Sequence, residues 1–134
     1  VIRLALEDRT ISIYGDGSQQ RDFVYVDDAA DAFLRAGASD ACNGEVFNVG
    51  GAAPVSHRDL VRQLVSLAES GRVEFVDWPP EKKAIDIGSF YADSSKLKNA
   101  TGWTPTVALD DGLRRTVEFC RANLSHYVDA PERA

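Results

Sequence analysis

The sequence predicts an α/β protein in which short strands alternate with amphipathic helices. β-Branched runs end at glycines, and apolar residues between those runs recur at helical spacing. The length of 134 residues suits one domain with a real core. This alternation is typical of α/β or α+β folds. Four short strands are too few for a complete doubly wound sheet, so the pattern resembles the end of such a fold with a small lobe attached.

The expected strands cover residues 10–14, 23–26, 45–49 and 73–76. The first alternates apolar and polar side chains, and a glycine-containing turn at residues 15–18 ends it because glycine tolerates positive φ. Each of the others is a short run that includes valine and an aromatic residue.

Helices are expected between these strands. Asp27 and Asp28 open one that ends near Gly37, since acidic side chains favour the positive end of a helix dipole. Ser56 with Asp59 forms a capping-box pattern at the start of the next.

The rest of the chain is expected to hold less regular structure. Residues 93–104 allow at most a short helix, and a last helix is expected at about residues 110–123. Adjacent prolines at residues 79–80 predict a segment without regular structure. We expect one domain over residues 1–128, followed by a loose tail at residues 129–134.

Residues 1–8 have the pattern of a helix already under way, without an initiator methionine or a cap before it. We therefore expect the chain to be part of a longer protein. Acidic residues interrupt this segment at once, which argues against a signal peptide. No run reaches the roughly 18 apolar residues of a membrane span.

A net charge of −6 argues against general affinity for nucleic acid, which requires a basic surface. Cys42 and Cys120 share no metal-ligand spacing and are expected to be reduced thiols of a cytoplasmic protein. His57 and His126 form no site pattern, and no metal site is expected.

The clearest motif runs from Tyr14 to Asp28 and reads Tyr-Gly-Asp-Gly-Ser-Gln-Gln-Arg-Asp-Phe-Val-Tyr-Val-Asp-Asp. A tight glycine turn lets the backbone approach a ligand, and the guanidinium of Arg21 just beyond it offers a fork of donors that matches a phosphate. From the residues alone, a surface salt bridge of Arg21 is the alternative.

This run is similar to one in the extended short-chain dehydrogenase/reductase family, which includes NAD-dependent nucleotide-sugar epimerases, dehydratases and decarboxylases. The C-terminal halves of its members carry Tyr-Gly-x-Gly-x-Gln-x-Arg-Asp-Phe-x-x-Val-x-Asp. The resemblance implies that Arg21 grips the diphosphate of a nucleotide sugar. It also implies that the turn from Tyr14 to Gln19 lies near the nucleotide.

A second stretch, residues 81–93, departs from the family pattern Arg-Arg-Pro-Gly-Asp. Alignment on its two aspartates places Lys83 at the arginine that meets the other side of the diphosphate, with Lys82 before it. Lysine keeps the charge but loses the bidentate fork, and a solvated lysine pair is the alternative. Phe90 occupies a position where family members often point an aromatic ring toward the sugar.

Two further stretches resemble scaffold segments of the family. Residues 45–51 match a strand that ends in Asn-x-Gly. Residues 93–116 match the terminal signature Asp-x-Ser-Lys, Gly-Trp-x-Pro and Leu-x-x-Gly-Leu. Trp103 of this signature is expected in the core.

Two family motifs are missing from the sequence. No Gly-x-x-Gly-x-x-Gly turn stands between a strand and a helix, and none of the four tyrosines has a lysine four residues on. The resemblance therefore implies that NAD or NADP and the catalytic residues belong to a missing N-terminal half of the parent. This chain is expected to bind the nucleotide-diphosphate sugar without binding cofactor or catalysing turnover. The alternatives are a free-standing binding module or a homo-oligomer that uses the exposed apolar face.

Overall fold

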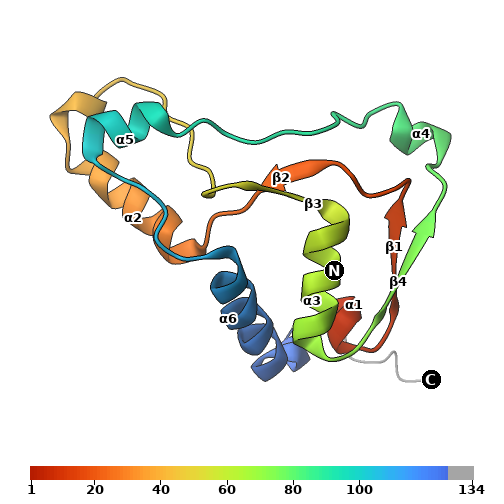
Figure 1. Ribbon diagram of the computed structural model, residues 1–134. Coiled ribbons are helices and arrows are strands. Elements are labelled where there is room, and N and C mark those ends of the chain that lie inside the picture. Colours follow the sequence, from red (N-terminus) through yellow and green to blue (C-terminus); the bar gives the residue numbers. More distant parts are fainter. Residues whose placement is uncertain (127–134) are drawn as a thin grey trace.

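A computed structural model of the protein describes the structure of residues 1–126. Figure 1 shows its strands and helices. The elements in chain order are α1 (Ile2–Leu6), β1 (Thr10–Tyr14), β2 (Gln20–Asp22), α2 (Val26–Gly37), the 3₁₀ turn η1 (Asp40–Cys42), β3 (Pro54–Ser56), α3 (His57–Ala68), β4 (Arg72–Val76), α4 (Pro80–Lys83), α5 (Ser95–Thr101), α6 (Leu109–Ala122) and the 3₁₀ turn η2 (Leu124–His126).

The described strands form two separate pairs, which Figure 1 shows side by side. β1 and β4 are parallel, with a register from Thr10↔Arg72 to Tyr14↔Val76. β2 and β3 are antiparallel, with a register from Gln20↔Ser56 to Asp22↔Pro54. A parallel pair needs a long crossover, and α3 lies on the chain that provides it. The two pairs therefore bring the turn after β1 close to the start of α3.

The larger hydrophobic cluster lies where β1 packs against α1, α3 and α6. Alternate residues of β1 point inward, so Ile11 and Ile13 are buried while Ser12 is exposed. Helical spacing places the inward side chains of α3 on one stripe. The buried members of the cluster are Ala5, Ile11, Ile13, Leu60, Val61, Leu64, Ala68 and Val117.

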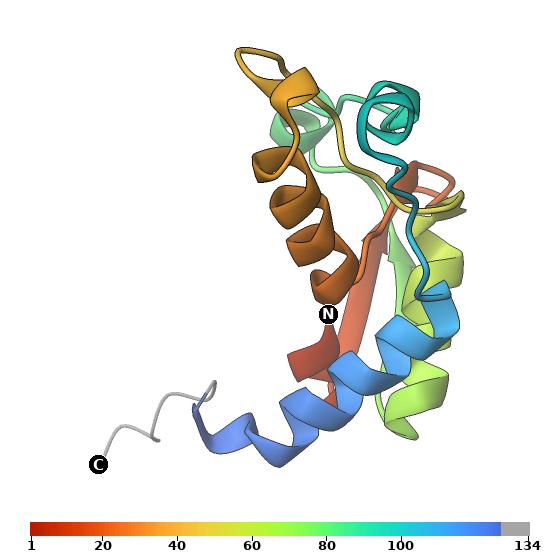
Figure 2. The same ribbon diagram turned by 90° about the vertical axis from the view of Figure 1, so that its left-hand side faces the viewer.

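The smaller hydrophobic cluster joins α2 to α5 at the other end of the molecule (Figure 1). Its buried members are Ala32, Leu97 and Trp103. Trp103 is 1% exposed and its indole N–H donates to the carbonyl of Asp28 at 3.0 Å, which confirms the expected core position. In Figure 2, α2 and α3 lie on opposite sides of the molecule, so the two clusters do not share one layer.

Buried Asp28 ties α2 to the segment before α6. Its carboxylate accepts hydrogen bonds from the backbone of Thr106 and Val107 and from the Thr106 hydroxyl, at 2.8–3.0 Å. Burial by itself raises the pKa of Asp28, but these three hydrogen bonds outweigh it and hold the pKa below its ordinary value. The second acidic residue of the predicted helix start therefore stabilises a long-range contact.

Most of the expected elements are confirmed. Residues 10–14 form β1, and residues 73–76 lie within β4. The initial helix, the helix from Asp27 to Gly37 and the last helix match α1, α2 and α6 within a few residues. At α3 the Ser56 hydroxyl accepts the Asp59 N–H at 3.2 Å, as the capping box predicts, whereas the Asp59 carboxylate accepts from the Ser56 hydroxyl.

The expected strand at residues 23–26 is wrong, because the chain pairs with β3 three residues earlier and Val26 already begins α2. Asp22 ends the pairing. Its carboxylate accepts the backbone N–H groups of Gly51 and Ala92 at 3.2 Å. A Cβ at Gly51 would lie 2.1 Å from the Phe23 carbonyl oxygen, so two backbones cross there at contact distance.

The expected strand at residues 45–49 is also wrong, since the structure assigns it no regular secondary structure. Residues 1–126 provide no partner strand for it. Phe47 and Val49 pack on the smaller cluster, while Val46 is 82% exposed. The strand-like composition is present, but a strand needs a neighbour to accept and donate its backbone hydrogen bonds.

The expectation of no regular structure at the two prolines is wrong as well. Pro80 is the first residue of α4, where its fixed φ suits a helix and its missing N–H costs nothing. α5 is the short helix expected within residues 93–104. The expected boundary after residue 128 and the loose tail lie outside the described residues. No helix within residues 1–126 is long and apolar enough to span a membrane.

Candidate functional site

A cavity of about 420 Å³ opens beside β2, between the turn after β1 and the first residue of α3. Three of the six predicted site residues line it: Tyr14, Gln19 and Arg21. The other lining residues are Val1, Phe23, His57, Leu60, Trp78 and Asp86. The cavity therefore joins the Tyr-Gly-x-Gly motif to residues far along the chain.

Arg21 is oriented by backbone carbonyls. Its Nη1 donates to the carbonyl oxygens of Gln20 at 2.7 Å and Gly88 at 2.5 Å. Within residues 1–126, Nε and Nη2 donate no hydrogen bond, and no carboxylate lies within ion-pair distance. The surface salt bridge weighed for Arg21 is thus not formed in this part of the chain. The Nε–Nη2 edge is the one that binds an anion with two parallel hydrogen bonds.

The glycine turn is built around Trp78. Gly15 has φ +63°, and a Cβ there would lie 2.6 Å from the Trp78 indole nitrogen. The rings of Tyr14 and Trp78 lie 5.3 Å apart at an interplanar angle of 34°. Glycine is therefore required both for its backbone conformation and for the close approach of the indole. The result is an aromatic wall on one side of the cavity.

Lys82 reaches the edge of the cavity through Tyr14. Its ammonium donates to the Tyr14 hydroxyl at 2.7 Å and lies 4.7 Å from the ring centroid. The hydrogen bond with Tyr14 raises the pKa of Lys82. This lysine stays charged and adds a cation beside the cavity, although it does not line it.

Lys83 and Phe90 do not line the cavity. Lys83 is an exposed residue of α4. The backbone N–H of Phe90 donates to the Gln20 carbonyl at 3.0 Å, but its side chain is 60% exposed. The two residues remain predictions about a bound ligand.

Sequence reasoning missed His57, Trp78 and Asp86 as cavity residues. His57 is the first residue of α3, and its backbone N–H donates to the Gln19 carbonyl at 2.9 Å. Burial, and next the charge of Arg21, lower the pKa of His57. In the sequence, only its position directly after the capping Ser56 could have drawn attention to His57. The pairing of β2 with β3 is what brings His57 to the same cavity as Arg21.

Gln19 contributes an unpaired polar atom. Its side-chain oxygen is buried without a hydrogen-bond partner among the described residues. A buried acceptor of this kind costs free energy unless a donor reaches it. A ligand hydroxyl or N–H in the cavity would supply that donor.

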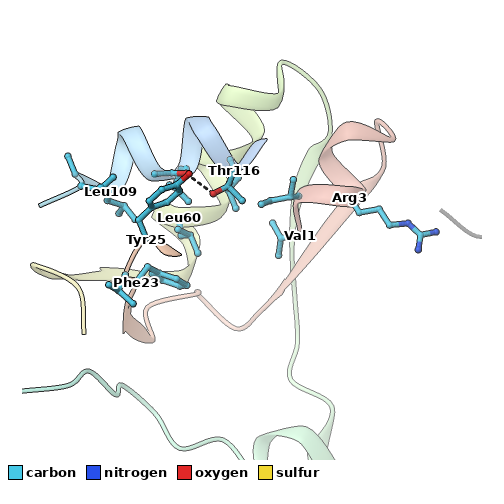
Figure 3. A pocket seen from close by; sticks show the side chains of 14 residues that line it. Val1, Arg3, Phe23, Tyr25, Leu60, Leu109 and Thr116 are labelled. Carbon is cyan, nitrogen blue, oxygen red and sulfur yellow. Dashed lines mark hydrogen bonds between the residues drawn. The ribbon is translucent and has the colours of Figure 1, made fainter. Parts of the chain in front are cut away.

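A larger cavity of about 570 Å³ lies next to it and has a different character. Figure 3 shows Phe23, Tyr25, Leu60 and Leu109 around it, whereas Arg3 points away. The Thr116 hydroxyl donates to the Gly112 carbonyl of its own helix at 2.7 Å. This cavity is an apolar surface with few polar groups to orient a small ligand.

The glycine turn after β1 and the start of α3 do not have the form of a dinucleotide pyrophosphate site. The glycine turn after β1 continues into β2 instead of a helix. β3 leads directly into α3, whose first three N–H groups donate to Gln19, Gly17 and Ser56. A pyrophosphate site needs such N–H groups free at a helix start.

The family model described as GDP-mannose 4,6 dehydratase matches residues 1–116. The chain is 39% identical over 116 residues to UDP-glucose 4-epimerase of Mycolicibacterium smegmatis. The alignment covers 87% of this chain and 36% of that protein. It is 32% identical over 135 residues to dTDP-glucose 4,6-dehydratase 1 of Escherichia coli, covering 96% of this chain and 37% of that protein.

Solved structures give the same picture. UDP-glucose 4-epimerase from Thermotoga maritima with UDP-glucose has a TM-score of 0.78 and 30% identity, over 92% of this chain and 38% of that one. UDP-glucuronic acid 4-epimerase from Bacillus cereus in complex with NAD has a TM-score of 0.75 and 30% identity, over 90% and 37%. The expected Rossmann-type α/β class is confirmed. The chain spans little more than a third of the length of these relatives.

Proposed function

This chain belongs to the GDP-mannose 4,6 dehydratase family, and from that premise we propose that it is the nucleotide-sugar-binding part of an NAD-dependent epimerase or dehydratase. Its relatives include UDP-glucose and UDP-glucuronate 4-epimerases and dTDP-glucose 4,6-dehydratases. The chain spans only about 37% of most of these relatives, and we assign it the C-terminal, substrate-binding role.

The observation that carries this proposal is the free edge of Arg21. Backbone carbonyls hold Nη1, so Nε and Nη2 are oriented before a ligand arrives. A diphosphate offers pairs of oxygens that match this edge, and a preoriented guanidinium loses little side-chain entropy on binding. Lys82 supplies a further positive charge from the Tyr14 side.

The nucleoside is proposed to lie against the aromatic wall. The Tyr14 and Trp78 rings offer apolar surface beside the charged site. The unpaired side-chain oxygen of Gln19 accepts a hydrogen bond from a base N–H or a ribose hydroxyl. A ligand with an anionic centre, a planar base and hydroxyl groups matches all three features.

The chemistry of the parent is proposed to reside outside this chain. NAD accepts a hydride from the sugar in such enzymes, and the present residues orient the sugar by fixing its diphosphate. Holding the reacting groups in the right orientation lowers a reaction barrier by on the order of several kcal/mol. We propose that the remaining part of the parent covers the apolar cavity in Figure 3.

A second candidate is a self-associating module without catalysis. The observation that favours it is the outer face of α2, where Phe33 is 75% exposed and Leu34 is 73% exposed. Adjacent exposed apolar side chains mark interaction surfaces. The size of the chain in solution separates this candidate from the first, as described below.

The proposal is tested by titrating the chain with UDP-glucose, dTDP-glucose and GDP-mannose, followed by Trp fluorescence and calorimetry. Arg21→Ala should weaken binding by about 10- to 100-fold, because a charge-assisted hydrogen-bond pair is lost. Arg21→Lys should restore part of the affinity by keeping the charge without the fork.

Arg62→Ala is the matched control, since Arg62 is an exposed arginine of α3 that does not line the cavity. This variant should bind with an affinity within about twofold of that of the original chain, a difference well below about 1.4 kcal/mol. Equal loss in both arginine variants, or no binding of any of the three ligands, would contradict the proposed role.

A further inference from the structure

We propose that His57 is a second contact to the ligand diphosphate, and that it binds in its protonated form, so that ligand binding takes up a proton. This inference rests on the proposed function and adds a residue and a pH dependence to the same site. Neither the family pattern on Arg21 nor the lysine pair points to this histidine.

The strand register places His57 and Arg21 together. In the β2–β3 pair, Arg21 is opposite Val55, so His57 occupies the diagonal position two residues further on. The backbone N–H of His57 extends the ladder by donating to Gln19. Diagonal neighbours on one face lie within reach of long side chains. Both side chains line the same cavity, which agrees with this geometry.

The charges around His57 favour its neutral form until an anion arrives. The guanidinium of Arg21 acts on it from β2, whereas the carboxylate of Asp86, in the segment after α4, lines the same cavity and has the opposite charge. On its own helix, Asp59 is engaged by the Ser56 hydroxyl, and Arg58 follows directly. The positive end of α3 acts in the same direction as the Arg21 guanidinium. Burial, followed by the charge of Arg21, lowers the pKa of His57.

A diphosphate between Arg21 and His57 reverses this balance. It neutralises the guanidinium and accepts a hydrogen bond from the imidazolium, so it favours the charged form. The backbone cannot play this part, because the N–H groups of His57 and Arg58 already donate to Gln19 and Gly17. The pKa of His57 is therefore lower in the free chain than in the complex, and affinity rises as pH falls between those two values.

The experiment is a calorimetric titration of the full 134-residue chain with UDP-glucose from about pH 8 to about pH 5.5, the range in which histidine titrates. UDP-glucose is the probe because its diphosphate diester keeps a constant charge over this range. A difference of one unit between the two pKa values changes the binding constant about tenfold. We therefore expect the affinity to rise by about tenfold from the highest to the lowest pH of the series. Buffers of different ionisation enthalpy should report net proton uptake.

Three variants make the test specific. His57→Gln should bind with nearly constant affinity across the series. His57→Lys carries a permanent charge, and should bind at about pH 8 as tightly as the original chain does near pH 5.5. Asp86→Asn should retain the pH slope, because the slope belongs to His57. Thermal unfolding of each variant checks that the fold is retained.

The outcomes separate this inference from the proposed function. Binding that depends on Arg21 but stays constant with pH, or weakens as pH falls, overturns the role of His57 and leaves the proposed function standing. A slope that persists in His57→Gln overturns it as well. No binding at any pH overturns both.

Discussion

The two hydrophobic clusters of this molecule differ in how completely the chain covers them. The larger cluster, around β1 and α3, draws eight buried residues from four elements, including α1 and α6. The smaller cluster, around Trp103, has three buried residues. Next to it, Phe33, Leu34 and Val46 remain largely exposed. The first cluster buries more side chains, although the apolar cavity of Figure 3 opens on it, whereas the second buries few and has exposed apolar side chains beside it.

The two regions therefore differ in the contacts that stabilise them. Around β1, apolar side chains from α1, α3 and α6 pack on the strand from several sides and stabilise it. Around Trp103, a single indole and the Asp28 hydrogen bonds hold α2, α5 and the segment before α6 together. The cavity with Arg21 lies on the β1 and α3 side, so its geometry depends mainly on the better covered region.

Trp103→Ala should have the largest effect. It removes a fully buried side chain and the hydrogen bond to Asp28, and the free energy of unfolding should fall by about 3–5 kcal/mol. Chemical denaturation measures this, and hydrogen exchange should show faster exchange in α2 and α5. Trp78→Ala is the matched control, because Trp78 is only half-buried in the cavity wall. Equal loss in both variants would argue against a separate second region.

Asp28→Ala should have a smaller effect, about 1–3 kcal/mol, because it leaves the N–H groups of Thr106 and Val107 without their acceptor. The folded pKa of Asp28 lies below its ordinary value of 3.8. The stabilisation is therefore full above that value and is lost as pH falls through the lower, folded pKa.

Urea titrations of the original chain and Asp28→Ala across the acid range check the direction. The difference in free energy of unfolding should be constant at neutral pH and should narrow below about pH 3.8. A difference that widens in acid would show that Asp28 does not act through its charged form.

The smallest effect on stability is expected at the exposed face of α2. A double substitution of Phe33 and Leu34 to serine should change the free energy of unfolding by no more than about 0.5 kcal/mol, the usual range for surface positions. It should also abolish any self-association seen by sedimentation. The neighbouring Arg35→Ser serves as the control. A chain that is monomeric at all concentrations would contradict the self-associating alternative.

Local patterns in the sequence predicted the elements whose stability is local. The alternation of Ile11 and Ile13, the cap at Ser56 and the amphipathic stripe of α6 are each contained in one short stretch of chain. They are sufficient to predict β1, α3 and α6. The core position of Trp103 followed from the resemblance, and the structure confirms it.

The candidate site was predicted in part. The Tyr-Gly-x-Gly-x-Gln-x-Arg motif is contiguous, so Tyr14, Gln19 and Arg21 could be placed together, and they line one cavity. Lys82, and not Lys83, contacts Tyr14, because the single turn of α4 turns the two side chains in different directions. That choice depends on how α4 packs, which the spacing of two adjacent lysines does not encode.

The sequence by itself determined the α/β class, the turn with its arginine and the capped helix α3. The signals for them are the spacing of apolar residues, the turn glycines and the N-cap serine, and each acts over a few neighbouring residues. Only the tertiary structure decided that β2 begins at Gln20, that residues 45–49 lack a partner among the described strands, and that His57 and Arg21 line one cavity. These features depend on pairing and contact between segments tens of residues apart, and that information lies in the packing of the whole chain.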